Sequence, residues 1–223
     1  MSYTGSVRPG GLYDGRDLTH IAIHKVAVDP AMSNNCYLLR CRHTGEQLLI
    51  DAAAEPERLV PWIGAGGLST VVTTHQHWDH HRALAAVVAA TGAEVIAGEP
   101  DAAAITEQTG VPVTRTVGQG DRIRLGESEL EVIAVRGHTP GSICLLYDDP
   151  AGPPHLFTGD SLFPGGVGNT FGDEAAFEQL INDVEERIFQ RLPDDTWFYP
   201  GHGDDSTLGR ERPSLAEWRE RGW

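Results

Sequence analysis

The segment VVTTHQHWDHH, over positions 71–81, places four of the chain's ten histidines within seven residues. The segment begins with branched residues, and the run RALAAVVAATG follows it. This pattern predicts a strand, a turn and then a helix. Alternate residues of an extended segment point the same way, so His75 and His77 can face one metal ion together. The turn into the helix would direct Asp79 and His80 toward a second position. His81 fits neither position, and we expect it to face solvent or to support the others.

The rest of the chain alternates between short strands and helices. Strands are expected over 20–28, 36–41, 47–52, 69–75 and 94–98, and again in ICLLYDD, HLFTGD and TWFYPGH. Helices are expected over 82–92, 99–110, 173–192 and 214–222. The strands and helices come in two successive groups. This α/β (α+β) order predicts two sheets with helices outside them. We expect residues 1–19 to be a loose N-terminal leader and residues 20–223 to form a single domain.

Charge and cysteine usage limit the partners. The chain has 17 Lys and Arg against 32 Asp and Glu, a formal net charge of −15. Such a chain offers no basic surface for nucleic acid or for an anionic membrane, so neither is expected as a partner. No run approaches the roughly 18–20 apolar residues that span a bilayer. The three cysteines form no Cys-x-x-Cys pair, which favours reduced thiols and a cytoplasmic location. The oligomeric state is left open.

Three further residues of metal-binding type follow predicted strands at Gly, Pro or Thr turns. His138 lies in RGHTPGS, Asp160 in FTGDSLF and His202 in YPGHGDD. A loop at such a turn can present a side chain from the rigid edge of a sheet. One isolated histidine of this kind is more often structural, but four such strand ends together favour a metal site. Imidazole and carboxylate donors without a thiolate suit zinc, and they also accept iron or manganese.

These motifs carry a family resemblance. HQHWDH resembles the His-x-His-x-Asp-His signature of the metallo-β-lactamase superfamily, and the later motifs follow in that family's order, as does Asp51 at the end of QLLID. The resemblance spans about residues 21–212. It implies an αββα sandwich with two divalent metal ions along one edge. Zinc is the expected metal, and iron and manganese are the alternatives. Seven residues resemble the family's ligands: His75, His77 and His138 for one ion, Asp79, His80 and His202 for the other, and Asp160 between them.

Within the superfamily, the chain looks most like the glyoxalase II (hydroxyacyl-thiol hydrolase) branch. The lactamases proper have Cys or Ser near the place of Asp160, and GHTPGS, TGDSLF and PGHG are similar to motifs of the glyoxalase II branch. The resemblance implies hydrolysis of a small-molecule thioester or ester by a metal-bound hydroxide, with Asp79 orienting the hydroxide. A thiolate with a pKa of about 8.5 leaves without a dedicated general acid.

Substrate-binding residues are expected in two places. Glyoxalase II enzymes hold glutathione with a basic residue and an aromatic residue after the bridging Asp, where this chain has Asn169 and Phe171. Only 21 residues follow His202, fewer than the usual C-terminal helical domain requires. A different carrier, such as mycothiol, coenzyme A or bacillithiol, or an ester without a thiol, is therefore an alternative. Arg210 and Arg212 could pair with a substrate carboxylate or could tie down the terminal helix.

Other functions on the same motifs remain open. A persulfide dioxygenase shares this fold and binds one iron through two histidines and an aspartate, a role that His75, His138 and Asp160 could fill. A lactonase would use the two-metal site on a cyclic ester. A binding module stabilised by metal is the non-enzymatic alternative, and the open hydroxide chemistry of the site disfavours it.

Overall fold

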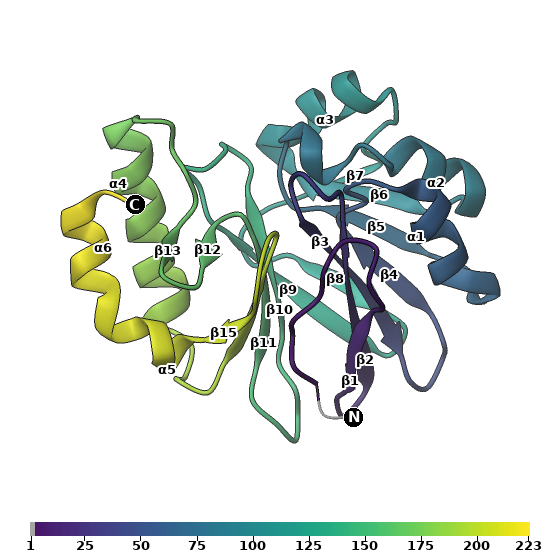
Figure 1. Ribbon diagram of the computed structural model, residues 1–223, viewed down its shortest axis with the longest axis horizontal. Helices are drawn as coiled ribbons and strands as arrows, with labels where there is room; N and C mark the ends of the chain where they lie inside the picture. The colour runs from purple at the N-terminus through teal and green to yellow at the C-terminus, as the bar shows by residue number, and fades with distance from the viewer. Residues whose placement is uncertain (1–2) are drawn as a thin grey trace.

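The computed structural model describes residues 3–223. Two β-sheets pack face to face, and helices cover the outer face of each (Figure 1). This arrangement confirms the expected αββα sandwich. No helix in residues 3–223 is long and apolar enough to cross a bilayer.

The first sheet has the strand order β1-β2-β3-β4-β5-β6-β7, the order of the sequence. Neighbours are antiparallel as far as β4 and parallel from β4 onward. Its strands are β1 (Asp14–Asp17), β2 (Ile21–Val28), β3 (Asn34–Cys41), β4 (Gln47–Ile50), β5 (Thr70–Thr73), β6 (Glu94–Gly98) and β7 (Arg115–Val117).

The second sheet has the order β15-β14-β11-β10-β9-β8, and only its β11·β14 pair is parallel. Its strands are β8 (Arg122–Leu125), β9 (Ser128–Ala134), β10 (Ile143–Tyr147), β11 (His155–Gly159), β14 (Trp197–Pro200) and β15 (Ser206–Thr207). A small hairpin of β12 (Leu162–Phe163) and β13 (Gly166–Val167) lies between β11 and the helices that follow.

The helices divide between the two outer faces. On the first sheet lie α1 (Pro56–Ile63), α2 (Leu84–Thr91) and α3 (Ala102–Thr109), and on the second lie α4 (Glu174–Val184) and α6 (Leu215–Arg221), with the short α5 (Leu208–Glu211) at their edge. Alternation along the strands supplies both cores. On β3, Tyr37 and Leu39 enter the core between the sheets, whereas Cys36 and Leu38 pack under the helices.

Two helices differ from the sequence expectation. The helix expected over 173–192 is α4, which Asp173 caps by accepting a hydrogen bond from the Ala176 amide, followed by a π-helical turn over Glu185–Phe189. The helix α1 has no counterpart among the expected elements. Its interior Pro61 is unfavourable in a helix, but Pro56 at the first turn is favourable, and burial of Leu59 and Ile63 offsets the interior proline.

The expectation of a loose leader over residues 1–19 is wrong for the residues that the structure describes. Asp14–Asp17 form β1 and pair with β2. Farther upstream, the Tyr3 hydroxyl donates to Asp205, and the carbonyl of Gly5 accepts from Lys25 Nζ at 2.8 Å. These partners are distant in sequence, which is why no local pattern predicted the contacts. Residues 1–2 lie outside the described part of the chain.

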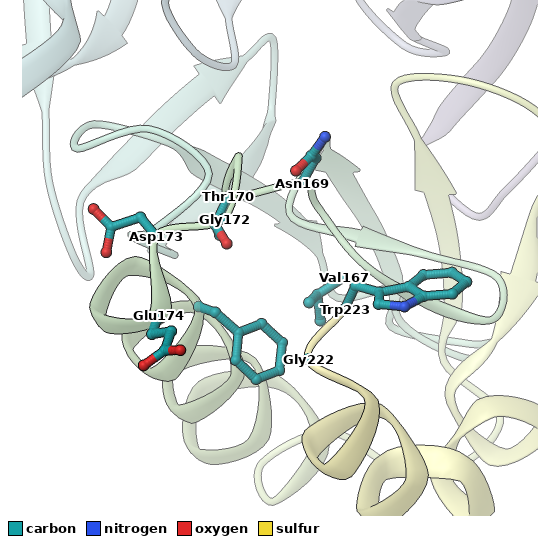
Figure 2. A pocket seen from close by; sticks show the side chains of 9 residues that line it. Val167, Asn169, Thr170, Gly172, Asp173, Glu174, Gly222 and Trp223 are labelled. Carbon is teal, nitrogen blue, oxygen red and sulfur yellow. The ribbon is translucent and has the colours of Figure 1, made fainter.

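A cavity of about 590 Å³ opens beside the second sheet (Figure 2). The loop after β13, the first turn of α4 and the residues after α6 surround it, so its wall combines segments about 50 residues apart. Phe177 and Trp223 are the aromatic residues of its lining.

The buried His155 generates a prediction about stability and pH. It lies on β11 with Nδ1 2.7 Å from the Tyr199 hydroxyl, and burial lowers its pKa to about 4. Because its ordinary pKa of about 6.5 is higher, the unfolded chain binds more protons between these two values, and stability falls as the pH drops through that window. With a chelator present to remove any metal ion, we expect the free energy of unfolding of the wild type to fall by about 2 kcal/mol more than that of His155→Gln between about pH 7 and pH 5. Urea unfolding at both pH values measures this, and equal losses in the two proteins would contradict it.

Candidate metal centre

The histidines and aspartates of the sequence motifs converge at one edge of the sandwich. The HQHWDH loop follows β5, His138 follows β9, Asp160 follows β11, and His202 follows β14. The first of these strands belongs to one sheet and the other three to the second sheet. The site therefore depends on the relative placement of both sheets.

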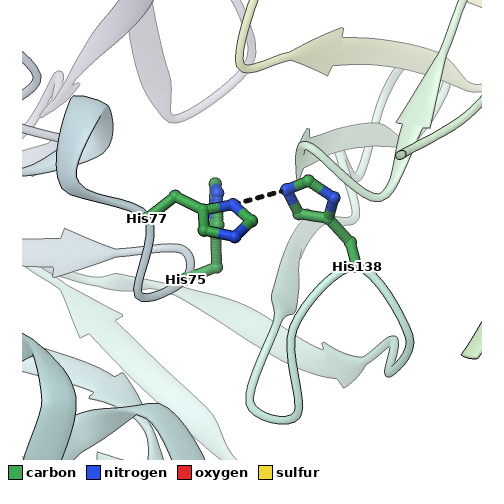
Figure 3. A group of neighbouring side chains, drawn as sticks. All are labelled: His75, His77 and His138. Carbon is green, nitrogen blue, oxygen red and sulfur yellow. Dashed lines mark hydrogen bonds between the residues drawn. The ribbon is translucent and has the colours of Figure 1, made fainter. Parts of the chain in front are cut away.

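The donor atoms form two neighbouring trios. Those of His75, His77 and His138 lie within 4.8 Å of one another, with His77 Nδ1 2.9 Å from His138 Nε2 (Figure 3). A second trio within the same limit is Asp79, His80 and His202.

Asp160 lies between the two trios. Its Oδ2 is 3.7 Å from His138 Nε2 and 3.4 Å from His202 Nε2, and its Oδ1 is 3.4 Å from His80 Nε2. Its donor atoms also group with those of His75 and His80 within 4.8 Å. Oδ2 therefore lies near a histidine of each trio and Oδ1 lies near His80 of the second, so the carboxylate is placed where a ligand shared by both trios is required.

The donor set fits a divalent metal ion. The Nε2 of His75 and the Oδ1 of Asp160 are buried without a hydrogen-bond partner, a costly state unless another group satisfies them. The Nε2 atoms of His80 and His202 face each other at 3.3 Å. Two nitrogens that each lie 2.0–2.1 Å from one tetrahedral zinc are separated by about 3.3 Å. Spacing and unsatisfied donors together indicate a divalent-metal site.

Three histidines are held by acceptors on their second ring nitrogen. The Nδ1 of His138 donates to the Asn169 carbonyl at 2.8 Å, and that of His202 donates to the Met32 carbonyl at 2.9 Å. The Nδ1 of His80 lies 2.9 Å from the Asp51 carboxylate. A proton on Nδ1 leaves the Nε2 lone pair toward the cluster, so these contacts select the metal-binding tautomer.

Asp51 also reaches the first trio. It accepts from the amide and the hydroxyl of Thr74, both at 2.8 Å, and the same hydroxyl oxygen lies 3.0 Å from His75 Nδ1. Because the hydroxyl proton goes to Asp51, the hydroxyl oxygen accepts from His75. Asp51 is one of the motifs on which the family resemblance rests, and the structure shows that its carboxylate orients a histidine of each trio.

Charges within the cluster shift its titration. Burial lowers the pKa of His75 well below its usual range. For His202 burial acts in the same direction, but hydrogen bonds to Asp160 and Asp79 outweigh it and raise the pKa to about 9. Burial would raise the pKa of Asp160, yet the neighbouring His80 and His202 hold it well below the ordinary value. The Asp160 carboxylate is thus anionic at neutral pH, and a bound cation would replace the imidazolium protons beside it.

Two supporting residues have no signal in the sequence. Asp101 is fully buried before α3 and accepts from the Gln76 amide at 2.9 Å, the Thr139 hydroxyl at 2.6 Å and the Gly141 amide at 2.7 Å. It therefore joins the loop of His77 to the loop of His138. Asn34 donates from Nδ2 to Asp79 at 2.9 Å. Around Asp101, EPDAAAI indicates only the start of a helix, and the partners of both residues lie 25 to 45 positions away, so neither role could be predicted.

The remaining expected residues have different surroundings. Phe171 is 72% exposed, and its ring centroid lies 5.8 Å from that of His77. Asn169 contacts the cluster through its carbonyl rather than its side chain. His81 is buried and donates to the Gln76 carbonyl.

The two C-terminal arginines are not brought to the cluster. Arg212 pairs with Asp194 and donates to the carbonyls of Phe189 and Leu192, which makes it the structural tie that the sequence left as an alternative. Arg210 is exposed on α5, which begins where β15 meets the Trp197 end of β14. That is the end of the strand opposite His202.

Comparison with known proteins identifies the family. Residues 29–202 match the family model described as the metallo-beta-lactamase superfamily. The chain belongs to the metallo-β-lactamase superfamily. This match contains the HQHWDH loop, both later histidines and Asp160.

One relative within the superfamily carries the name of the branch that the motifs resemble, and two solved structures share the fold. A hydroxyacylglutathione hydrolase of Polaromonas sp. (strain JS666) is 39% identical over 184 residues, which are 81% of this chain and 66% of that protein. The chain thus spans slightly under two thirds of that relative. The structure of ETHE1 from Myxococcus xanthus covers 89% of this chain and 84% of its own, with 28% identity and a TM-score of 0.76. TTHA1623, solved in a di-iron-bound form, covers 84% of this chain and 96% of its own, with 30% identity and a TM-score of 0.65.

The buried Asp101 carboxylate generates a prediction about metal affinity. In Asp101→Ala the loops of His77 and His138 lose their shared acceptor, so we expect about 10–100-fold weaker metal binding at neutral pH. Competition with a chromophoric chelator measures the affinity, and circular dichroism verifies the fold. The control Asp121→Ala removes an exposed carboxylate from a turn and should bind metal as the wild type does. Wild-type affinity in Asp101→Ala would contradict the positioning role.

Proposed function

We propose that the chain is a dinuclear metallo-hydrolase that cleaves the thioester of a small thiol carrier, as glyoxalase II enzymes do. The observation that carries the proposal is the pair of donor trios with Asp160 between them. The name of the Polaromonas relative supports a thioester substrate, and the di-iron form of TTHA1623 supports two metal ions. Zinc is the proposed ion, with iron or manganese as alternatives, because the donors are nitrogen and oxygen without sulfur.

Each residue of the cluster has a proposed part. His75, His77 and His138 would hold one ion, Asp79, His80 and His202 the other, and Asp160 both. When bound, such a pair of ions supplies hydroxide near neutral pH and polarises the substrate carbonyl. The protein residues fix the donors and exclude the wrong tautomers, so little reorganisation accompanies the reaction.

Asp79 has a second proposed role, which is to orient the attacking oxygen. Burial opposes ionisation of Asp79, but contacts with His202, His80 and Asn34 hold its pKa well below the usual range. It is therefore an anionic hydrogen-bond acceptor at the pH of catalysis. The Asn34 side chain donates to Oδ2 at 2.9 Å, which limits rotation of the carboxylate.

The chemistry of the leaving group fits this set of residues. A thiol has a pKa of about 8.5, so the thiolate departs without a proton from the enzyme. An alkoxide leaving group would need more assistance from an acid, which favours a thioester over an unactivated ester. Free, buried Cys36, Cys41 and Cys144 support the proposed reducing, cytoplasmic location. We also propose that 20–223 form one metallo-hydrolase domain, to which residues 3–19 are attached by the contacts of β1 and Tyr3.

Replacement of Asp160 tests the proposed function. In Asp160→Ala we expect hydrolysis of S-lactoylglutathione or of a small acyl thioester to fall by at least about 100-fold, because both ions lose a ligand. Elemental analysis should show about two ions per wild-type chain and one or fewer in the variant. Asp204→Ala, an exposed carboxylate beside the His202 loop, is the matched control.

The alternatives make different predictions in the same experiment. An unchanged rate in Asp160→Ala would refute the assignment. A wild-type protein with one iron per chain that consumes oxygen with a persulfide would establish the dioxygenase instead. Hydrolysis of acyl lactones without hydrolysis of thioesters would establish a lactonase.

A further inference from the structure

The cavity between α4 and the residues after α6 is lined by aromatic and acidic residues. Its lining includes the aromatic residues Phe177 and Trp223, the acidic residues Asp173 and Glu174, and Asn169. The volume of about 590 Å³ lies within the range of pockets that bind small molecules. No Lys or Arg lines it in the part of the chain that the structure describes.

The cavity and the metal centre share one loop. The Asn169 carbonyl accepts from His138 Nδ1 at 2.8 Å, while the same residue lines the cavity. Two residues later Phe171 lies over His77, and Gly172 is again part of the cavity wall. The strip from Asn169 to Gly172 therefore has the metal centre on one side and the cavity on the other. A substrate whose reacting carbon lies at the metals can extend over this strip.

The charge of the cavity disfavours an anionic ligand. On the α6 side Arg221 lies against a lining residue, with its guanidinium 3.6 Å from the ring centroid of Trp223. It is already engaged by the Gly165 carbonyl at 2.7 Å and by Glu217 at 2.8 Å. Carboxylate and phosphate groups are normally bound by Arg or Lys, and here they would instead meet two carboxylates.

The lining suits a neutral group with many hydroxyls. Aromatic rings pack against the C–H faces of such a group, and ionised carboxylates accept from its hydroxyls without needing a donor in return. The Asp173 Oδ1 caps α4 by accepting from the Ala176 amide, so this carboxylate is held in place. We infer that the cavity binds the far end of the thiol carrier and that this end is a neutral, polyhydroxylated, sugar-like group. The inference rests on the proposed thioester hydrolysis.

Three thioesters with the same lactoyl group test the inference. They are esters of N-acetylcysteamine, of glutathione, and of N-acetylcysteinyl-glucosamine, a neutral thiol that carries a sugar. We expect the sugar-bearing thioester to have a kcat/KM at least about tenfold above that of the glutathione thioester, mainly through a lower KM. The N-acetylcysteamine ester reaches only the metal centre and reports the hydrolase activity alone.

Charge reversal at the cavity tests the role of its carboxylates. In Glu174→Lys we expect kcat/KM for the glutathione thioester to rise, kcat/KM for the sugar thioester to fall, and the N-acetylcysteamine ester to be hydrolysed as before. Glu174 is exposed at the first helical position of α4, so the fold should tolerate the change. Glu186→Lys makes the same change of charge at an exposed position beyond α4 and should leave all three rates unaltered.

The outcomes separate the two proposals. No hydrolysis of the N-acetylcysteamine ester by metal-loaded protein would overturn the proposed function. If that ester is hydrolysed but kcat/KM for the glutathione thioester equals or exceeds kcat/KM for the sugar thioester, only the inference about the cavity is overturned. Unchanged selectivity in Glu174→Lys would overturn it as well.

Discussion

The hydrogen bonds of the Asp51 carboxylate are the constraint on which the rest of the site depends. One oxygen accepts from the Thr74 amide, and the other accepts from the Thr74 hydroxyl and from His80. The hydroxyl in turn accepts from His75. Asp51 has a φ of 58°, a strained conformation that Asp tolerates better than most residues and that ends β4 abruptly. The chain therefore accepts local strain to fix the tautomers of two histidines from one buried carboxylate.

A second constraint joins the two sheets at the same edge. Lys25, fully buried on β2, donates to the Gly203 carbonyl at 2.8 Å and to Asp205 at 2.7 Å, just after His202. Asn35 on β3 donates to the carbonyls of Pro200 and Gly203, both at 2.9 Å. Strands of the first sheet thus hold both sides of a histidine that the second sheet supplies. A buried ion pair contributes little net stability, so its value here is the placement of the His202 loop.

Prediction from the sequence succeeded where the signal is local. The spacing of His75, His77, Asp79 and His80 within one loop was sufficient to place them together, and the order of strands and helices was sufficient to predict two sheets with helices outside them. It failed where the partner is distant or where the contact uses the main chain. Asp101 acts on residues from 25 to 40 positions away, and His202 depends on a carbonyl of Met32, so neither contact has a pattern of its own.

Anomalous diffraction from crystals of the metal-loaded protein, recorded on both sides of the zinc absorption edge, shows directly how many metal ions are bound and where they lie. Two separate anomalous peaks per chain are expected. One should lie within the trio of His75, His77 and His138, the other should lie within the trio of Asp79, His80 and His202, and Asp160 should contact both. A single peak, or peaks outside these two trios, would contradict the proposed dinuclear site.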